Sequence, residues 1–579
     1  MKTRTPLFLL FTLFSIVAGT LHLSAQYKQT TVNRTTLVRD QGNILPLQRL
    51  DRLKIAVVTP VKGTYTPFIE QLQKYAEVRV FDFNKYAENT KYFNTIIVAG
   101  IEKDLRSDLI SLLQQSAVNG KQVILCQFRE SKSLGNPWNT PTYQSAFTEL
   151  VSPDFAPISQ RNAAMSIFGG LALTEGNLKT EQTRIQYTAG ENSGLDISTM
   201  TRKIDAIANE AISNRATPGL VVMALKSGQV IFEKAYGSHT YENKQATTID
   251  DIFDLASISK IAGTTPVVMT LQEQGIISLD STIGHYLGQA KTTNKADITT
   301  RSVLLHEAGF TPFIPFYRNL KSGDLLSYED TEHQVKVADN AFLKNNYYRD
   351  VMWPEMLSSA VKPVGNYVYS DISMYVMKEI AEHETSTRME EFVQQFLYKP
   401  IGMKTAGYNP RTRFDKSRIV PTQNDTSFRK VLLQGYVHDE GAAMAGGVAG
   451  HAGLFATAND LAIYAQLLLN RGEYGGVRYF KPETVDLFTS NQSQSSRRGL
   501  GFDRADPDLK KAYPSKLANS SVYGHTGYTG TCIWIDPKDQ LVYIFLSNRV
   551  HPQVTGKLYE LNIRSRIQDV IYETINEAK

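Results

Sequence analysis

The sequence predicts two structural units, a parallel α/β unit near the N-terminus and a larger mixed unit that contains β-hairpins. The 579 residues are too many for one hydrophobic core. Between residues 27 and 187, short apolar runs alternate with helix-like segments, which is typical of a parallel sheet with helical crossovers. From residue 198 onward, apolar runs come in pairs around turn residues, as in hairpins.

The first 25 residues have the features of a secretory signal. Lys2 and Arg4 precede an apolar stretch over residues 7–18, and Ser24-Ala25 offers a cleavage site. The apolar stretch is too short to cross a bilayer comfortably. No cysteine that could carry a lipid anchor lies near the cleavage site. We expect removal of residues 1–25, export across the inner membrane to the periplasm, and a mature protein without a membrane span.

Apolar runs supply the expected strands of the first unit, which we place at residues 27–187. They are residues 54–60, 78–83, 94–100 and 122–128. Helix-like segments over 67–75 and 103–118 separate them. Gly190 and Gly194 then indicate a linker over 188–197, so we place the second unit at 198–579.

The second unit begins and ends with paired strand-like runs. Residues 219–225 and 229–236 flank Ser227-Gly228, a pair suited to a tight turn. Near the C-terminus, residues 531–535 and 541–546 flank another turn. We expect a β-hairpin at each place.

Ser257 and Lys260 form the most informative motif. A serine hydroxyl becomes a good nucleophile only when a neighbouring base takes its proton. A lysine three residues later on one helix lies on the same face as the serine. The apolar spacing after Ser257 predicts such a helix, which ends near Gly275. A serine at a helix start also gains free backbone N–H groups that can hold an oxyanion.

The pattern Ser-x-x-Lys also begins at Ser359 and Ser427. Ser359 leads to Lys362-Pro363, and a proline disfavours helical geometry at the residue before it. Ser427 lies in a polar run typical of a loop. We therefore expect the nucleophile at Ser257.

Two downstream motifs accompany the serine and lysine, namely Tyr369-Ser370-Asp371 and His525-Thr526-Gly527. With these motifs, residues 198–579 resemble the class C β-lactamase and penicillin-binding-protein-like family of serine hydrolases. That family's motifs are Ser-x-x-Lys, Tyr-x-Asn and Lys/His-Thr-Gly. Four connecting segments also resemble the family: residues 271–280, 304–310, 400–403 and 450–457.

The resemblance implies an α+β domain, in which helices flank an antiparallel sheet and form a helical subdomain. It implies that Ser257 is the nucleophile and that Lys260 and Tyr369 share the role of general base. The backbone N–H groups of Ser257 and Tyr528 would form the oxyanion hole. The expected substrate contacts are Asp371, His525, Thr526 and Gly527. No metal or organic cofactor is implied.

Two positions depart from the commonest form of the family motifs. Asp371 replaces an asparagine, so a donor amide becomes a carboxylate that only accepts hydrogen bonds when ionised. That carboxylate could pair with Lys260 and keep it charged, or point elsewhere. His525 stands where other members have lysine, and its ordinary pKa near 6.5 predicts partial charge at neutral pH. Substrates that carry a carboxylate should then bind more weakly as the pH rises.

The N-terminal unit resembles a different family. Residues 36–47 and 166–170 are similar to the C-terminal sandwich domain of glycoside hydrolase family 3. That family keeps its nucleophilic aspartate in a preceding barrel, and the residues before 198 are too few for a barrel plus the sandwich. We therefore expect an α/β sandwich without glycosidase activity, for which carbohydrate binding or packing remain alternatives.

Composition narrows the range of partners. The formal net charge of +5 is small for this length, and no basic run with interleaved aromatics occurs, so we expect no nucleic-acid partner. His438-Asp439-Glu440, with His451 nearby, resembles a metal cluster but lacks a helical i, i+4 pair. Structural hydrogen bonding is the favoured interpretation, and no metal is expected. Cys126 and Cys532 are expected to be buried thiols.

The sequence thus predicts a secreted serine hydrolase that forms an acyl-enzyme on an ester, a D-peptide or a β-lactam-like bond. We expect small-molecule or peptide acyl substrates, cell-wall fragments among them, and a place in cell-wall metabolism. The alternative is a catalytically silent protein that binds cell-wall glycan or peptide, since Asp371 is the kind of change that inactivation leaves. The sequence distinguishes neither the acyl substrate nor the oligomeric state.

Overall fold

The computed structural model describes residues 35–60, 63–101, 104–105, 107–129, 147–173, 180–188 and 190–579. All of these residues belong to one unit, Asn33–Lys579. The expected signal segment, residues 1–25, lies outside the described residues. Within the described part, no helix has the length and apolar character needed to cross a membrane.

The N-terminal part contains a six-stranded sheet in the order β1-β6-β5-β4-β2-β3. Only β1 runs antiparallel to its neighbour, and the other pairs are parallel. The strands are β1 (Thr36–Arg39), β2 (Ile55–Thr59), β3 (Val78–Asp82), β4 (Thr95–Ile101), β5 (Gln122–Phe128) and β6 (Thr148–Ser152). The helices are α1 (Thr66–Tyr75), α2 (Phe83–Asn89), α3 (Ser107–Val118) and α4 (Pro157–Phe168). The apolar runs predicted as parallel strands are therefore confirmed as β2 to β5.

Alternating side chains of β2 explain why helices cover both faces of this sheet. Ile55 and Val57 belong to one hydrophobic core together with residues of α1 and α4. Ala56 and Val58 belong to a second core together with residues of α2 and α3. Because successive side chains of a strand point to opposite faces, a strand that is buried on both faces reads as a continuous apolar run. The predicted α/β sandwich class is confirmed.

The second sheet has the order β18-β19-β20-β21-β7-β8 and is antiparallel throughout. Its strands are β7 (Gly219–Lys226), β8 (Gln229–Gly237), β18 (Asp503–Arg504), β19 (Tyr523–Thr526), β20 (Cys532–Asp536) and β21 (Leu541–Ser547). Both predicted hairpins are confirmed as β7–β8 and β20–β21. Ser227 and Gly228 have φ of 50° and 77°, as expected for a type I′ turn.

Helices cover both faces of this sheet as well. Tyr543 and Phe545 of β21 pack in a core with α5 (Ile197–Ser213) and α17 (Ile563–Glu577). Val542 and Ile544 face the opposite way, into the core that contains α14 (Ala458–Leu469). This arrangement confirms the expected antiparallel sheet flanked by helices.

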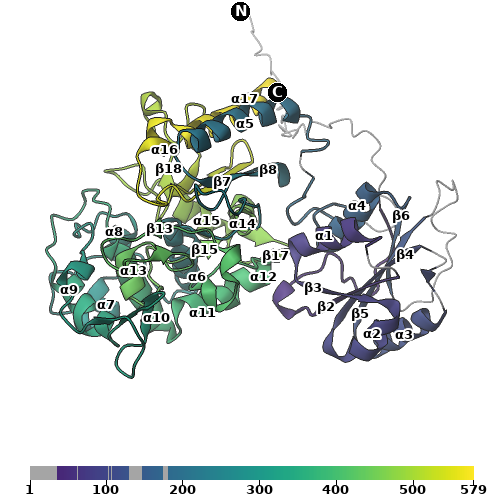
Figure 1. The fold of residues 1–579 in the computed structure, drawn as a ribbon, viewed down its shortest axis with the longest axis horizontal. Coiled ribbons are helices and arrows are strands. Elements are labelled where there is room, and N and C mark those ends of the chain that lie inside the picture. The colour runs from purple at the N-terminus through teal and green to yellow at the C-terminus, as the bar shows by residue number, and fades with distance from the viewer. Residues whose placement is uncertain are drawn as a thin grey trace, which may run out of the picture. The chain divides into compact units, whose positions relative to one another are not determined.

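Shorter helices, joined by loops, lie in the remaining chain (Figure 1). They are α6 (Thr265–Glu273), α7 (Ile283–Tyr286), α8 (Thr300–Leu304), α9 (Trp353–Ser358), α10 (Ile372–Thr385), α11 (Met389–Val393), α12 (Lys399–Ile401), α13 (Glu440–Met444), α15 (Pro482–Thr489) and α16 (Lys557–Glu560). Small strand pairs are inserted between them: β9 (Phe253–Asp254) with β15 (Phe455–Ala456), β13 (Gln423–Asn424) with β14 (Leu432–Leu433), and β16 (Glu473–Tyr474) with β17 (Val477–Arg478). A three-stranded group consists of β10 (Leu325–Leu326), β12 (Ala341–Leu343) and β11 (Val335–Ala338).

Buried polar contacts hold the chain that connects the two sheets. The guanidinium of Arg184 donates to the carbonyls of Leu47 and Phe168, at 2.6 Å each. Tyr75 Oη donates to the carbonyl of Ile185 at 2.7 Å, and Tyr187 Oη donates to Asn459 at 2.6 Å. Because an unpaired buried polar group is costly, these contacts constrain the path of residues 184–187.

Candidate active site

Ser257 lies in a tight turn between β9 and the π-helical turn η5 (Lys260–Thr264). Ala256, just before it, has φ of 46°, a left-handed conformation that residues with a side chain adopt only at a cost. Thr529 Oγ1 donates to the carbonyl of Asp254 at 2.7 Å, and Thr531 Oγ1 donates to that of Leu255 at 3.2 Å. The loop after β19 therefore holds the turn in place, with Ser257 at the start of a helical segment as predicted.

Residues from two predicted motifs meet at the serine hydroxyl. Lys260 Nζ lies 3.0 Å from Ser257 Oγ, and Tyr369 Oη also lies 3.0 Å from it. The other two Ser-x-x-Lys serines bond locally. Ser359 Oγ donates to the carbonyl of Met356, and Ser427 Oγ donates to Asp425. The serine, lysine and tyrosine chosen from the sequence are thus brought together, and the rival serines are not part of the group.

Lys260 is fully buried and forms an ion pair with Asp371, with Nζ 2.8 Å from Oδ1. Burial alone would lower the pKa of the lysine. The negative charge of Asp371 and the nearby Tyr369 oxygen outweigh burial, so the pKa of Lys260 lies above its ordinary value. Of the two orientations left open for Asp371, the structure has the one that keeps Lys260 cationic.

A histidine and a second carboxylate complete the surroundings of Lys260. The backbone carbonyl of His451 accepts a hydrogen bond from Lys260 Nζ at 3.3 Å, and His451 Nε2 lies 2.9 Å from Asp439 Oδ1. Ligand atoms of Asp371, Asp439 and His451 lie within 4.8 Å of one another. The ammonium of Lys260 already supplies a positive charge to this group, and Asp439 is engaged by the histidine ring. Within the predicted His438-Asp439-Glu440 and His451 cluster, the contact between Asp439 and His451 is therefore a hydrogen bond.

Tyr369 is positioned by His306. The two rings lie 4.6 Å apart between centroids, and His306 Nδ1 accepts a hydrogen bond from the backbone N–H of Ser370 at 3.2 Å. Burial, with the positive charges of Arg498 and Lys260, lowers the pKa of His306 well below its usual range. A neutral His306 can serve as the acceptor that this contact requires.

His525 of β19 is buried, and its electrostatic state differs from the prediction. Burial and the neighbouring Arg498 lower the pKa of His525 to about 3. The prediction of a partly charged His525 at neutral pH is therefore wrong, because an imidazolium there would be desolvated and close to a guanidinium. Its Nδ1 lies 2.7 Å from the carbonyl of Thr526, and its Nε2 lies 3.5 Å from Arg498 Nη2.

Arg498 supplies the fixed positive charge beside the third motif. Its side chain is 3% exposed, and its guanidinium lies 5.9 Å from the ring centroid of Tyr369. Asp503 Oδ1 lies 3.7 Å from Arg498 Nη1. Sequence reasoning did not find Arg498.

The end of β19 places backbone donors near Ser257. Gly527 is required there, because an added Cβ would lie 2.1 Å from Thr531 Oγ1 and 2.5 Å from the carbonyl of Leu255. Among the described residues, the backbone N–H groups of Ser257 and Tyr528 donate to no acceptor. This is the state expected of oxyanion-hole donors. Thr526, the remaining expected contact, is half-buried on the same strand.

Comparison with known proteins decides the family. A family model described as Beta-lactamase matches residues 204–566. The chain belongs to the β-lactamase family. An Escherichia coli (strain K12) protein assigned as a D-alanyl-D-alanine carboxypeptidase is 30% identical over 372 residues, which cover 59% of this chain and 82% of that protein. A Bacillus subtilis (strain 168) N-acetylmuramyl-L-alanine amidase is 30% identical over 381 residues, 61% of this chain and 82% of the amidase.

Among solved structures, a penicillin-binding protein homologue from Caulobacter crescentus is similar with a TM-score of 0.48 at 16% identity. The similarity covers 64% of this chain and 97% of that one.

As a member of the β-lactamase family, this chain carries serine-hydrolase machinery with two local changes. The aspartate at position 371 pairs with the catalytic-motif lysine, and the histidine at position 525 is neutral. Arg498 and the strained turn at Ala256 are further features of the site that no local sequence signal marked.

Proposed function

We propose that this protein is a secreted serine hydrolase that forms an acyl-enzyme at Ser257 and releases the terminal D-amino acid from short cell-wall peptides. The observation that carries the proposal is the approach of Lys260 Nζ and Tyr369 Oη to Ser257 Oγ, at 3.0 Å each. The names of the E. coli and B. subtilis relatives, a D-alanyl-D-alanine carboxypeptidase and an N-acetylmuramyl-L-alanine amidase, support a cell-wall substrate.

Tyr369 is the general base in this proposal. Asp371 holds Lys260 in its charged form, and an ammonium cannot accept the serine proton. The base role that the family resemblance divided between Lys260 and Tyr369 therefore falls to Tyr369, whose phenolate oxygen takes the proton from Ser257 Oγ and becomes a phenol. The buried ammonium of Lys260 interacts with the tyrosine oxygen and stabilises negative charge on it.

Acylation then proceeds through a tetrahedral intermediate. Ser257 Oγ bonds to the scissile carbonyl carbon, and the backbone N–H groups of Ser257 and Tyr528 hold the resulting oxyanion. Collapse of the intermediate breaks the C–N bond, and Tyr369 gives its proton to the leaving amine. The acyl group remains as an ester on Ser257.

Deacylation repeats these steps with water. Tyr369 takes a proton from a water molecule, whose oxygen bonds to the acyl carbon. The C–Oγ bond then breaks, and Ser257 Oγ recovers the proton from Tyr369. The product is a carboxylic acid, and the enzyme returns to its starting state.

Arg498 favours a D-peptide over a neutral ester. A peptide that ends in a D-amino acid carries a terminal carboxylate, and the guanidinium beside His525 provides positive potential next to the third motif. His525 itself is neutral and contributes hydrogen bonding. Asp371, His525, Thr526 and Gly527 remain the proposed substrate contacts.

A panel of acyl donors tests the proposal. The mature protein is incubated with a peptide that ends in D-Ala-D-Ala, with a nitrophenyl ester and with a penicillin, and kcat/KM is compared. We expect release of D-alanine with the highest kcat/KM, and none by Ser257→Ala. Turnover of the ester alone would contradict the assignment to D-peptides.

A silent binding protein is the second candidate, because the Lys260–Asp371 ion pair removes one potential base. A fluorophosphonate probe separates the two candidates. A silent protein would bind cell-wall peptide but would leave the probe unreacted.

We also propose that residues 27–187 form a domain of the family 3 sandwich type, joined through residues 188–197 to the hydrolase at 198–579. The helices on both faces of the six-stranded sheet support a sandwich. We expect no cleavage of nitrophenyl glycosides, and cleavage that persists in Ser257→Ala would contradict this view.

A further inference from the structure

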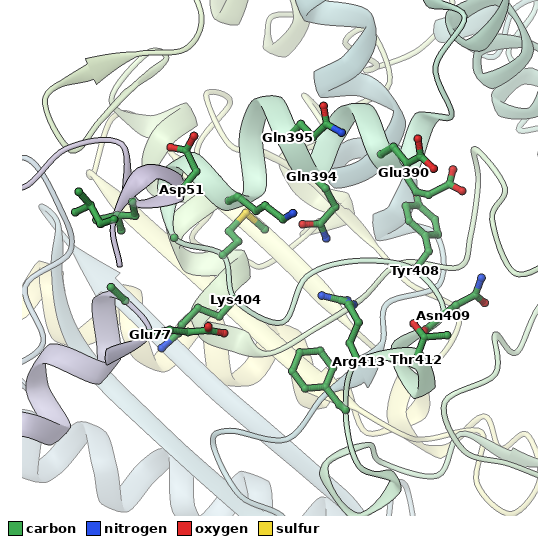
Figure 2. A pocket seen from close by; sticks show the side chains of 18 of the residues that line it. Asp51, Glu77, Glu390, Gln394, Gln395, Lys404, Tyr408, Asn409, Thr412 and Arg413 are labelled. Carbon is green, nitrogen blue, oxygen red and sulfur yellow. The ribbon is translucent and has the colours of Figure 1, made fainter. Parts of the chain in front are cut away.

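A cavity lies apart from the catalytic residues, none of which lines it (Figure 2). Its volume is about 740 Å³, within the range typical of small-molecule sites. One wall comes from η1 (Leu50–Arg52) and the end of α1, and the other from α11, η9 (Gln394–Tyr398) and residues 402–414. We refer to it as the η1–α11 cavity.

The side chains that line the η1–α11 cavity mix hydrogen-bond donors and acceptors. Figure 2 shows Asp51 and Glu77 on one side and Gln394, Glu390 and Arg413 on the other. The charged lining residues are the carboxylates Asp51, Glu77, Glu390 and Glu391 and the cations Lys399, Lys404 and Arg413. The two signs nearly balance, so the cavity has no excess charge that would favour an anion or a metal ion.

Internal contacts hold part of this lining in position. Arg413 Nη2 donates to the carbonyl of Thr405 at 2.9 Å, and Gln394 Nε2 donates to that of Ala406 at 2.6 Å. Asp51 accepts from Arg49 at 2.7 Å and 2.9 Å. A ligand would therefore meet groups whose orientation is already set, which lowers the entropy cost of binding.

Other lining groups have unused hydrogen-bonding capacity. In the part of the chain that the structure describes, the side chains of Glu77, Glu391 and Gln395 make no hydrogen bond or ion pair. Tyr408 also lines the cavity, is 7% exposed, and its hydroxyl has no partner among the described residues. A buried hydroxyl without a partner is uncommon, because each such group loses hydrogen bonds to water.

We propose that the η1–α11 cavity binds a neutral saccharide of the kind found in glycan strands. Each sugar hydroxyl both donates and accepts, which matches a lining that combines amides, carboxylates and cations with nearly balanced charge. The apolar C–H faces of a sugar ring would pack against Phe414, Leu53 and Met403, which also line the cavity. This binding site is independent of acyl transfer at Ser257.

Calorimetry on the full mature chain tests the proposal. Ser257→Ala protein, which cannot turn over, is titrated with tri-N-acetylglucosamine and separately with inorganic phosphate. We expect the saccharide to bind and phosphate not to bind. Thr412→Trp and Gln395→Trp, which place an indole at the cavity wall, should each weaken saccharide binding at least about tenfold. Lys538→Trp, in the exposed turn between β20 and β21, should leave the affinity unchanged.

Two results would overturn the saccharide site. One is no binding of the trisaccharide up to about 10 mM. At that concentration, calorimetry would detect a dissociation constant in the millimolar range. The other is equal affinity in Lys538→Trp and in both cavity variants. If Thr412→Trp and Gln395→Trp fail to fold, Phe414→Ala serves instead, with the same tenfold loss expected. Because every titration uses Ser257→Ala protein, a negative result would not bear on acyl transfer at Ser257, which the panel of acyl donors tests separately.

Discussion

The ammonium of Lys260 lies 2.8 Å from Oδ1 of Asp371, at the position where the family motif has asparagine. Because this ion pair holds the lysine in its charged form, it determines which residue can act as the base.

Asp371→Asn should shift the alkaline limb of the kcat/KM profile to lower pH. Asp371 raises the pKa of Lys260, so an amide in its place lets the lysine lose its proton at a lower pH. A shift of about one unit corresponds to about 1.4 kcal/mol of lost ion-pair stabilisation. The measurement is kcat/KM for a chromogenic substrate across the alkaline range, with the exposed Asp350→Asn as control. An unchanged limb would show that the pair does not govern the lysine's charge.

Tyr369→Phe should reduce kcat by about 10² to 10⁴, the usual contribution of a general base. The change removes the oxygen that lies 3.0 Å from Ser257 Oγ and leaves the ring on His306. Tyr367→Phe is the matched control, because Tyr367 lies two residues away and its hydroxyl makes no contact with Ser257. Equal losses in the two variants would indicate a structural effect.

The rate with a carboxylate-bearing peptide should show no titration of His525 between about pH 5 and about pH 8. The pKa of His525 is lowered to about 3, so the ring is neutral throughout that range and gains a proton only in strong acid. His525→Asn should therefore leave the shape of the pH profile unchanged, whatever its effect on the rate. A limb near pH 6.5 that disappears in His525→Asn would contradict the buried, neutral state.

The residues predicted correctly are those whose motifs are local in the chain. Ser257 and Lys260 lie one helical turn apart, and the hydrophobic spacing after them marks the helix. Arg498 was missed because it lies 27 residues before His525 and only the fold of β18 and β19 brings the two together. The charge of His525 was mispredicted for a related reason, since its burial depends on distant segments.

Prediction of the fold from local sequence patterns has the same limit as prediction of the site. The buried parallel strands β2, β4 and β5 were predicted, because strands covered on both faces are continuously apolar. The short edge strand β1 and its partner β6 were not, because their pairing joins residues more than a hundred positions apart. Their place depends on tertiary contacts that a local pattern does not contain.

Gly527→Ala should destabilise the protein by about 1–3 kcal/mol and reduce activity more than tenfold. A methyl group there would lie 2.5 Å from the carbonyl of Leu255, two residues before the nucleophile, and would displace the turn. Urea unfolding and kcat/KM are measured together. Gly288→Ala is the control, since no atom lies within 4 Å of the position of its added Cβ. Normal activity in Gly527→Ala would show that the packing of this loop does not position Ser257.

The most direct test of acyl-enzyme formation at Ser257 is intact-mass spectrometry after exposure of the mature protein to a fluorophosphonate. We expect a single adduct that maps to Ser257, is absent in Ser257→Ala, and forms in Ser359→Ala and Ser427→Ala as in the wild type. An adduct on Ser359 or Ser427, or no adduct in the folded wild-type protein, would contradict it.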